Sequence, residues 1–200
     1  MAIKLDKCVI MLTPKCGTGW IREVFQKEMT IIGNNRPEVP LDVGDTKGSR
    51  THSHLQCTDT QGLFTIGLVR NPLTWLQSLW SYWNTHGWPT YGDQFASCKH
   101  STFHGFVEKV VQLYPGVVTT TFKNFVGEPG EIGYICKQEN LREDLKQAFK
   151  IAGQEHNEEV IDNKPTVNFS KHNTGYTAEL AKSVIEAEWE SMTRFGYIGI

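Results

Sequence analysis

The sequence lacks a large net charge of either sign, and this absence argues against partners that bind through charge alone. Lys and Arg number 20 against 22 Asp and Glu, which leaves a net charge of −2. No general electrostatic attraction to nucleic acid or to an anionic membrane surface is therefore expected. The chain also has no apolar run long enough for a transmembrane helix, and the apolar stretch near its N-terminus is too short for a signal peptide.

Cysteines with the spacing of a metal site are absent as well. The five cysteines are an odd number and form no C-x-x-C pair. This pattern fits a reducing compartment, so we expect the protein in the cytoplasm. Internal repeats and low-complexity segments are also missing. A length of 200 residues without such features favours one domain, 1–200, large enough for a real hydrophobic core.

One stretch near the start of the chain organises the rest of it. Residues 8–12 form a short apolar run that suits a buried strand, and a turn with Gly17 and Gly19 follows. These glycines allow backbone N–H groups to approach a ligand closely, and Thr18 is placed to cap the next helix. Free N–H groups at a helix start, together with the charge of Lys15, predict a site for a phosphate or sulfate group.

This turn alone leaves two interpretations open. Many α/β proteins have a glycine-bearing turn between a strand and a helix that binds nothing. The triphosphate-binding loop G-x-x-x-x-G-K-[ST] has its Lys after the last Gly, whereas Lys15 precedes both glycines. The geometry of an anion site here must therefore differ from that of a triphosphate loop.

A second buried strand is predicted over residues 63–69. It ends at Arg70, and Pro72 opens a helix over 73–83 that carries an apolar stripe. Ligands of open α/β sheets bind at the carboxyl ends of the strands, which is where Arg70 lies. Ser78 is two turns along the helix and can point back to the same region. An ordinary surface arginine is the alternative interpretation.

Two histidines, His52 and His54, are two residues apart, so that in an extended segment both side chains point to the same side. Such a pair is compatible with a catalytic base, because His titrates near neutral pH. It is also compatible with part of a metal site, for which no third ligand is in view, or with an inert surface.

The rest of the chain alternates strands and helices. β-branched and aromatic residues predict a strand or hairpin arm over 117–125, and residues 134–136 predict a short buried strand followed by a helix that ends near Gly153. A last helix is predicted over 177–195. Its expected buried side consists of Leu180, Val184, Ala187 and Trp189. The alternation predicts an α/β domain with a central, mostly parallel sheet flanked by helices.

Motifs at the ends of these strands resemble those of sulfotransferases. Residues 13–20 read T-P-K-C-G-T-G-W and resemble the 5′-phosphosulfate loop of that family, T-x-P-K-S-G-T-x-W. Arg70-Asn71-Pro72 followed by Ser78 resembles the family's 3′-phosphate motif, an Arg with a Ser eight residues later. These two motifs are fairly specific together.

Further, weaker matches follow in the family's order. Residues 51–55 are similar to the T-H-L segment that carries the catalytic base, and residues 139–144 to an E-x-L-x-x-D stretch. Residues 170–173 and 195–197 resemble the C-terminal cofactor loop and tail. The matches together cover nearly the whole chain.

The resemblance implies a P-loop-like sulfotransferase fold and the cofactor 3′-phosphoadenosine 5′-phosphosulfate. Such enzymes mainly position the reacting groups and stabilise charge on the leaving phosphate. Arg70 and Ser78 would hold the 3′-phosphate, and Lys171 would close over the cofactor. The residues implied at its 5′ end and adenine are Lys15, Cys16, Gly17, Thr18, Gly19 and the stacking Trp20.

The resemblance also implies a histidine base that takes the acceptor's proton. His54 is preferred, because His54-Leu55 aligns with the H-L of the family segment, and His52 is the second candidate. Lys15 is expected to contribute to catalysis through its charge at the leaving group. The acceptor is a hydroxyl or amine, by analogy that of a carbohydrate or another small alcohol. Neither nucleic acid nor a membrane is expected as a partner, and the oligomeric state is left open.

Three residues depart from the family's pattern, and three other functions stay open. Cys16 replaces the usual Ser, Gly19 replaces a frequent Thr, and Gln138 stands where some members have an adenine-contacting Tyr. A cysteine at a helix start beside Lys15 would have a lowered pKa, which is what a thiol-dependent enzyme needs. The loop spacing, and the lack of an acidic strand end for magnesium, disfavour a nucleotide kinase. A non-catalytic nucleotide-binding module is the remaining alternative.

Overall fold

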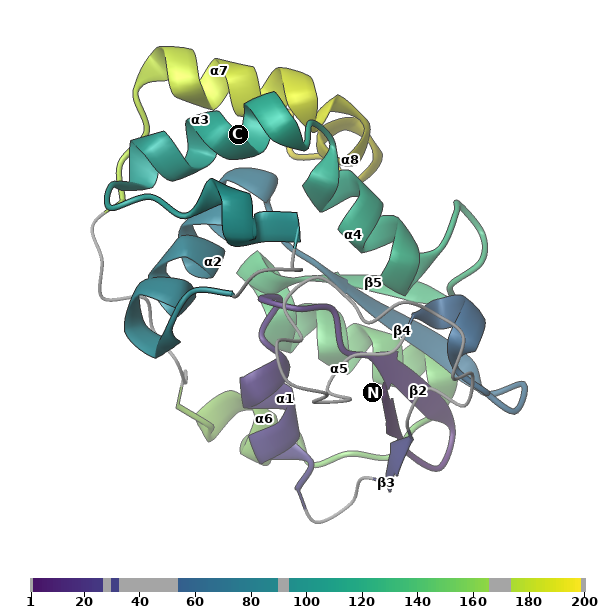
Figure 1. Cartoon of the computed structure of the whole chain (residues 1–200). Coiled ribbons are helices and arrows are strands. Elements are labelled where there is room, and N and C mark those ends of the chain that lie inside the picture. Colours follow the sequence, from purple (N-terminus) through teal and green to yellow (C-terminus); the bar gives the residue numbers. More distant parts are fainter. Residues whose placement is uncertain (1, 27–29, 33–53, 90–93, 166–173, 199–200) are drawn as a thin grey trace. The chain divides into compact units, whose positions relative to one another are not determined.

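The computed structural model describes residues 2–26, 30–32, 54–89, 94–165 and 174–198. The chain divides into two compact units, whose helices and strands are labelled in Figure 1. The sheet unit comprises Met1–Arg70 and Phe122–Phe169, and the helical unit comprises Asn71–Thr121 and Ser170–Ile200. The single domain expected over 1–200 stays a prediction.

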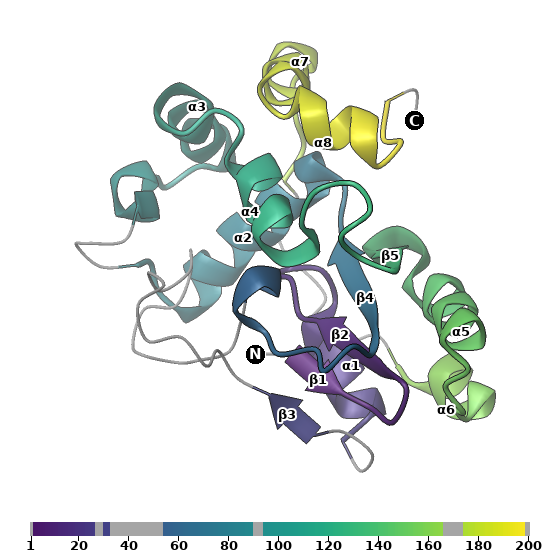
Figure 2. The same ribbon diagram turned by 90° about the vertical axis from the view of Figure 1, so that its right-hand side faces the viewer.

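The sheet unit is built on a mixed sheet, which within the described residues has five strands in the order β3-β1-β2-β4-β5 (Figure 2). β2 (Cys8–Met11), β4 (Phe64–Val69) and β5 (Tyr134–Lys137) are parallel neighbours. β1 (Ala2–Lys4) pairs antiparallel with both β2 and β3 (Thr30–Ile32). All of the strands except β1 thus run in one direction. The α/β class is confirmed, and so are the strands predicted over 8–12, 63–69 and 134–136. The strands β1 and β3 were not predicted.

Both faces of β2 are buried, which explains its uninterrupted apolar sequence. On one face, Val9 and Met11 pack together with Ala2, and Leu55, Leu63 and Ile132 cover them. Side chains alternate across a strand, so Cys8 and Ile10 point to the opposite face. They too are fully buried. The segment that follows β2 therefore starts from a fixed position in the core.

Among the described residues of this unit, the sheet is accompanied by helices α1 (Thr18–Val24), α5 (Leu141–Ala152) and α6 (Glu158–Asn163). Phe25, directly after α1, meets Phe149 of α5 edge to face with ring centroids 5.4 Å apart. α5 ends at Gly153, whose φ of 64° is the left-handed conformation that a helix C-terminus commonly needs. The predicted end of that helix is confirmed.

The helical unit holds its elements around an aromatic cluster. Trp83 of α2 contacts Phe95 and Phe106, with ring centroids 5.2 and 5.9 Å away. The described elements of this unit are α2 (Pro72–His86), η2 (Gln94–Cys98), α3 (Phe103–Leu113), the start of α4 (Val117–Val126), α7 (Ala178–Ala187) and α8 (Trp189–Arg194). Among the described helices, none combines the length and the apolar character needed to cross a lipid bilayer.

The strand predicted over 117–125 is wrong, because these residues form helix α4. Their apolar side chains recur at helical spacing and not in strict alternation. The fully buried ones are Val118, Phe122, Phe125 and Val126. Tertiary burial of this stripe outweighs the β propensity of the valines and threonines.

The last predicted helix, over 177–195, is interrupted at Glu188, whose buried carboxylate binds the start of α4. Glu188, between α7 and α8, accepts hydrogen bonds from the backbone N–H groups of Val118 at 3.0 Å and Thr119 at 2.8 Å, and from the Thr119 hydroxyl at 2.7 Å. Val184 is buried as predicted. Trp189 is 57% exposed, so its expected place on the buried side is wrong. The residue that turns inward is its acidic neighbour.

Candidate functional site

The loop after β2 has an unusual backbone conformation. Lys15 has φ of 62° and Gly17 has φ of 88°, and the N–H of Cys16 donates to the carbonyl oxygen of Thr13 at 3.3 Å. A non-glycine residue in this left-handed region costs about 1–3 kcal/mol and is found mostly where the backbone serves a function. The loop therefore holds the Lys15 backbone in a conformation that a non-glycine residue seldom adopts.

Helix α1 begins at Thr18, and its N-cap is Gly17. The expectation that Thr18 caps this helix is wrong, because the cap residue makes no side-chain hydrogen bond and Thr18 is already the first helical residue. Thr18 and Gly19 are both partly exposed in the first turn. Both residues are thus partly accessible to solvent.

Arg70 directly follows β4, the parallel neighbour of β2, so both strands deliver their next residues to the same edge of the sheet. The guanidinium of Arg70 donates through Nη1 to the carbonyl oxygen of Lys15 at 3.1 Å. Two cationic residues from sequence positions 55 apart are therefore brought together at one edge.

Lys15 and Arg70 make this edge of the sheet electropositive, and the charged form of Lys15 is destabilised there. The pKa of Lys15 is lowered from its ordinary 10.5 to about 8, first by burial and then by the charge of Arg70, while Cys16 acts in the opposite direction. An ammonium group in this position lacks the solvation that water would give it. An anion bound beside it would restore that stabilisation.

The segment from β5 to the start of α5 packs against the loop at Gly17. A Cβ atom on Gly17 would lie 2.6 Å from Cδ2 of Leu141 and 3.8 Å from Cγ of Gln138. The segment is fixed by Asp144, whose carboxylate accepts from the backbone N–H of Lys137 at 2.7 Å. The connection from β5 to α5 thus leaves room for glycine alone at position 17.

Trp20 is 6% exposed, and its surroundings lie in the sheet unit. Its indole N–H donates to the carbonyl oxygen of Lys164 at 3.3 Å, and the guanidinium of Arg142 lies 5.6 Å from the ring centroid. Arg142 also donates to the carbonyl oxygens of Asp162 at 2.9 Å and Lys164 at 2.5 Å. Stacking of Trp20 on adenine stays a prediction, and Arg142 is a neighbour of Trp20 that the sequence analysis did not single out.

Cys16 does not have the lowered pKa expected of a cysteine beside Lys15. Its side chain is fully buried, and this burial raises the pKa of the thiol. The nearby charges of Arg70 and Lys15 act in the opposite direction, and Glu139 adds to the rise. Burial outweighs them, so the thiol stays protonated at neutral pH.

His54 lies just before the short helix η1 (Leu55–Cys57). Its ring meets that of Phe125 edge to face at 5.4 Å, and its carbonyl oxygen accepts from the Thr58 hydroxyl at 2.8 Å. The side chain borders a cavity of about 200 Å³. His54 thus borders a cavity of the sheet unit, and its role as the catalytic base stays a prediction.

The remaining predicted residues are distributed differently. Ser78 lies on α2 in the helical unit and is partly exposed. His52 and Lys171 lie outside the described residues. Their roles, and the joint action of Ser78 with Arg70, stay predictions.

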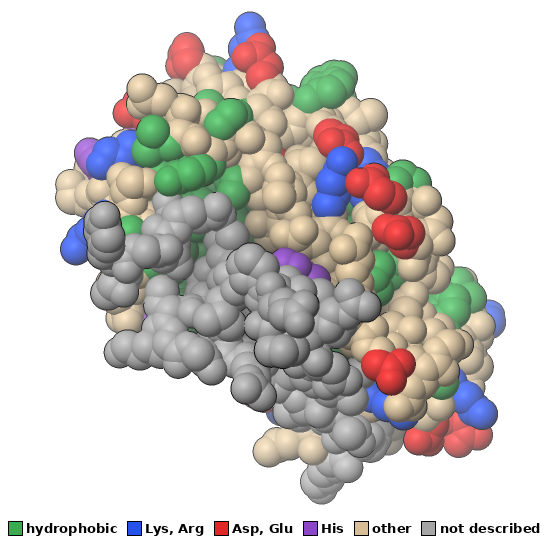
Figure 3. Space-filling view, turned by 45° about the vertical axis from the view of Figure 1, so that its right-hand side comes forward, with side chains coloured by type: hydrophobic (Ala, Val, Ile, Leu, Met, Phe, Trp, Pro, Cys, Tyr) green, Lys and Arg blue, Asp and Glu red, His purple; other side chains and the backbone are tan. Residues whose placement is uncertain are grey.

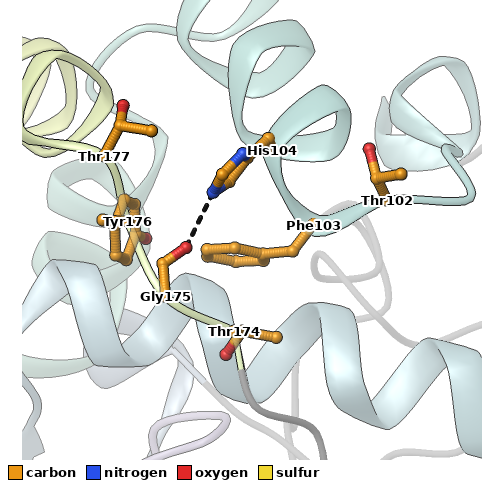
Figure 4. Close-up of a pocket in the computed structure, with 7 residues that line it drawn as sticks. All are labelled: Thr102, Phe103, His104, Thr174, Gly175, Tyr176 and Thr177. Atoms are coloured by element: carbon orange, nitrogen blue, oxygen red, sulfur yellow. Dashed lines mark hydrogen bonds between the residues drawn. The ribbon is translucent and has the colours of Figure 1, made fainter.

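A larger hollow of about 460 Å³ lies in the helical unit (Figure 4). Figure 4 shows the imidazole of His104 directed at the carbonyl oxygen of Gly175, and Nε2 lies 2.8 Å from that oxygen. The rings of Phe103 and Tyr176 meet edge to face at 4.9 Å. Its lining is more apolar than that of the cavity at His54, and no sequence motif pointed to it.

Acidic and basic side chains are interspersed on the face shown in Figure 3, in keeping with the net charge of −2.

No protein-family model, no curated protein and no solved structure matches the chain. The chemistry of the residues themselves is therefore the basis for any functional assignment.

Proposed function

We propose that this protein is a sulfotransferase with a P-loop-like fold, which moves the sulfuryl group of 3′-phosphoadenosine 5′-phosphosulfate to a hydroxyl or amine. One observation carries the proposal. The hydrogen bond from Arg70 to the carbonyl oxygen of Lys15 joins the residues of the two most specific motifs at one edge of the sheet. A molecule with phosphate groups on the 3′ and 5′ oxygens of one ribose needs two such cationic positions close together.

The residues at this edge have chemistry that suits the cofactor. Lys15, which burial makes short of solvation, would neutralise the oxygen on which negative charge develops. The backbone of residues 16–19 would bind the 5′-phosphate, and Arg70 would grip the 3′-phosphate with its planar fork. When bound, the cofactor supplies a sulfuryl group whose bond to the 5′-phosphate breaks as the acceptor oxygen bonds to sulfur. His54 would take the proton of that oxygen.

The alternatives fare differently. A thiol-dependent enzyme is disfavoured, because the Cys16 side chain is fully buried and its pKa is raised. A non-catalytic nucleotide-binding module shares the cationic edge and differs in lacking a working base. Cys16→Ser separates the thiol-dependent enzyme from the proposal, and sulfate transfer by the wild type separates the binding module from it.

The first experiment is a thermal-shift and calorimetric titration with adenosine 3′,5′-bisphosphate, with adenosine 5′-monophosphate as the comparison. We expect the bisphosphate to bind more tightly than the monophosphate. Arg70→Ala should remove most of that preference, because the loss of a charged hydrogen bond lowers the affinity roughly tenfold or more. The absence of bisphosphate binding would overturn the proposal.

The second experiment follows transfer of radiolabelled sulfate from the cofactor to a panel of alcohols and amines. Lys15→Ala should lower turnover far more than cofactor affinity, and His54→Ala should abolish transfer with affinity preserved. Cys16→Ser should stay active. Binding without transfer in the wild type would favour the binding module, and loss of activity in Cys16→Ser would favour the thiol enzyme.

A further inference from the structure

The cavity beside His54 is small, polar and built from two segments of the sheet unit. It measures about 200 Å³, below the roughly 300–1,000 Å³ of sites for drug-sized ligands. One wall comes from the segment at η1 and the other from the end of α4 and the turn before β5. Its lining residues are His54, Gln56, Lys123, Asn124, Gly127, Glu128 and Glu131. The size fits one small molecule or one unit of a longer one.

The two walls are held close by a glycine and an ordered carboxylate. Gly127 has φ of 65°, and a Cβ on it would lie 2.5 Å from Oε2 of Glu131 and 2.9 Å from Cδ2 of Leu55. The same Glu131 oxygen accepts from the backbone N–H of Glu128 at 2.6 Å. The carboxylate is thus fixed in orientation before any ligand arrives, which lowers the entropy cost of binding.

The charges at the cavity favour a cation. Lys123 lies 3.3 Å from Oε1 of Glu128 and offsets the charge of that carboxylate. Glu131 adds a second negative charge against the single lysine. Gln56 and Asn124 contribute amides that donate and accept hydrogen bonds. The lining therefore suits a ligand with hydroxyls and a positive charge, and it repels an anionic one.

We propose that this cavity binds the acceptor, and that the acceptor is a small amino alcohol or a single amino-sugar unit. The inference rests on the proposed function, since His54 is the base of that reaction. The acceptor's ammonium group faces Glu131 and one of its hydroxyls faces His54. That hydroxyl oxygen bonds to sulfur, its proton passes to His54, and the bond from sulfur to the 5′-phosphate breaks, so that adenosine 3′,5′-bisphosphate leaves with the electron pair.

The test measures binding of three sugars of similar size to the intact chain by ligand-observed NMR: glucosamine, glucose and glucuronic acid. At about pH 7 most of the glucosamine carries its positive charge. We expect glucosamine to bind most tightly and glucuronic acid least. In Glu131→Gln, which keeps an oxygen for the Glu128 N–H, the preference for glucosamine over glucose should fall roughly tenfold. The matched control Glu155→Gln removes an exposed carboxylate outside the cavity and should leave the preference unchanged.

The outcomes separate this inference from the proposed function. Equal binding of glucosamine and glucuronic acid by the wild type would overturn the inference without any variant. The same holds if Glu131→Gln behaves like the control. If the bisphosphate binds and sulfate is transferred only to acceptors without an amine, the acceptor class is wrong and the sulfotransferase proposal stands. If glucosamine binds at this cavity and no bisphosphate binds, the sulfotransferase proposal fails and the specificity of the cavity stands.

Discussion

The lowered pKa of Lys15 predicts that the proposed binding of a phosphate ligand depends on pH in a defined direction. In the free protein this pKa is about 8, mainly because the ammonium group is buried. A bound phosphate places negative charge beside it, which favours the charged form and raises the pKa. Ligand binding must then draw a proton onto Lys15 whenever the pH is near or above 8.

The size of the effect follows from the fraction of Lys15 that is protonated before binding. With a pKa of about 8, that fraction falls from roughly nine-tenths at pH 7 to roughly one-tenth at pH 9. The affinity for adenosine 3′,5′-bisphosphate should therefore fall about tenfold across this range, and about half a proton should be taken up per ligand at pH 8.

Calorimetry in buffers with different ionisation enthalpies measures both quantities. Lys15→Arg is the matched control, because arginine keeps the positive charge and does not titrate in this range. The variant should bind with nearly constant affinity from pH 7 to 9. Equal pH dependence in wild type and Lys15→Arg, or no proton uptake in the wild type, would refute the role given to Lys15.

The same pKa shift has a consequence for the ligand-free protein. The unfolded chain holds the Lys15 proton up to about pH 10.5, and the folded chain releases it near pH 8. Between these values the unfolded state binds more protons, so the stability rises with pH. The gain is of the order of 3 kcal/mol for a shift of this size. It should appear in urea unfolding of the wild type and be absent from Lys15→Arg.

Three further changes test the surrounding structure. Gly17→Ala forces a Cβ into Leu141 at a positive φ and should lower the free energy of unfolding by about 1–3 kcal/mol; an unchanged urea midpoint would contradict the described loop. Arg142→Ala removes the cation above Trp20 and two hydrogen bonds, so we expect about 2 kcal/mol less stability and faster amide exchange across α6. Glu188→Ala leaves the start of α4 uncapped and should cost about 2 kcal/mol in thermal unfolding, whereas Glu188→Gln, which retains an acceptor, should cost less.

The sequence predicted the features that depend on local pattern. The apolar runs of β2 and β4 and the polar residues directly after them are short-range signals, and parallel pairing places such residues at one edge. Lys15 and Arg70 could therefore be expected to lie together from the sequence. The hydrogen bond between them gives that expectation its geometry.

What the sequence could not give depends on contacts between distant residues. Residues 117–126 have the β-branched composition of a strand, and the Glu188 carboxylate that accepts from the first N–H groups of α4 lies 70 positions away from Val118. The pKa of Cys16 is governed by complete burial, which a local reading of Lys15 and the helix start misses. Arg142 reaches Trp20 from another helix, and it stands at an unspecified position of the E-x-L-x-x-D stretch.

The contact between Arg70 and the Lys15 backbone also bears on how binding of the 3′-phosphate and binding of the 5′-phosphate would affect each other. A guanidinium group has five N–H donors, so it can keep the Lys15 carbonyl while its other donors hold an anion. Occupancy of one cationic position would then stiffen the other, and each half of the ligand would raise the affinity for its counterpart. Substitutions at positions 15 and 70 should accordingly be non-additive in a double-mutant cycle, as for two residues that act as one unit.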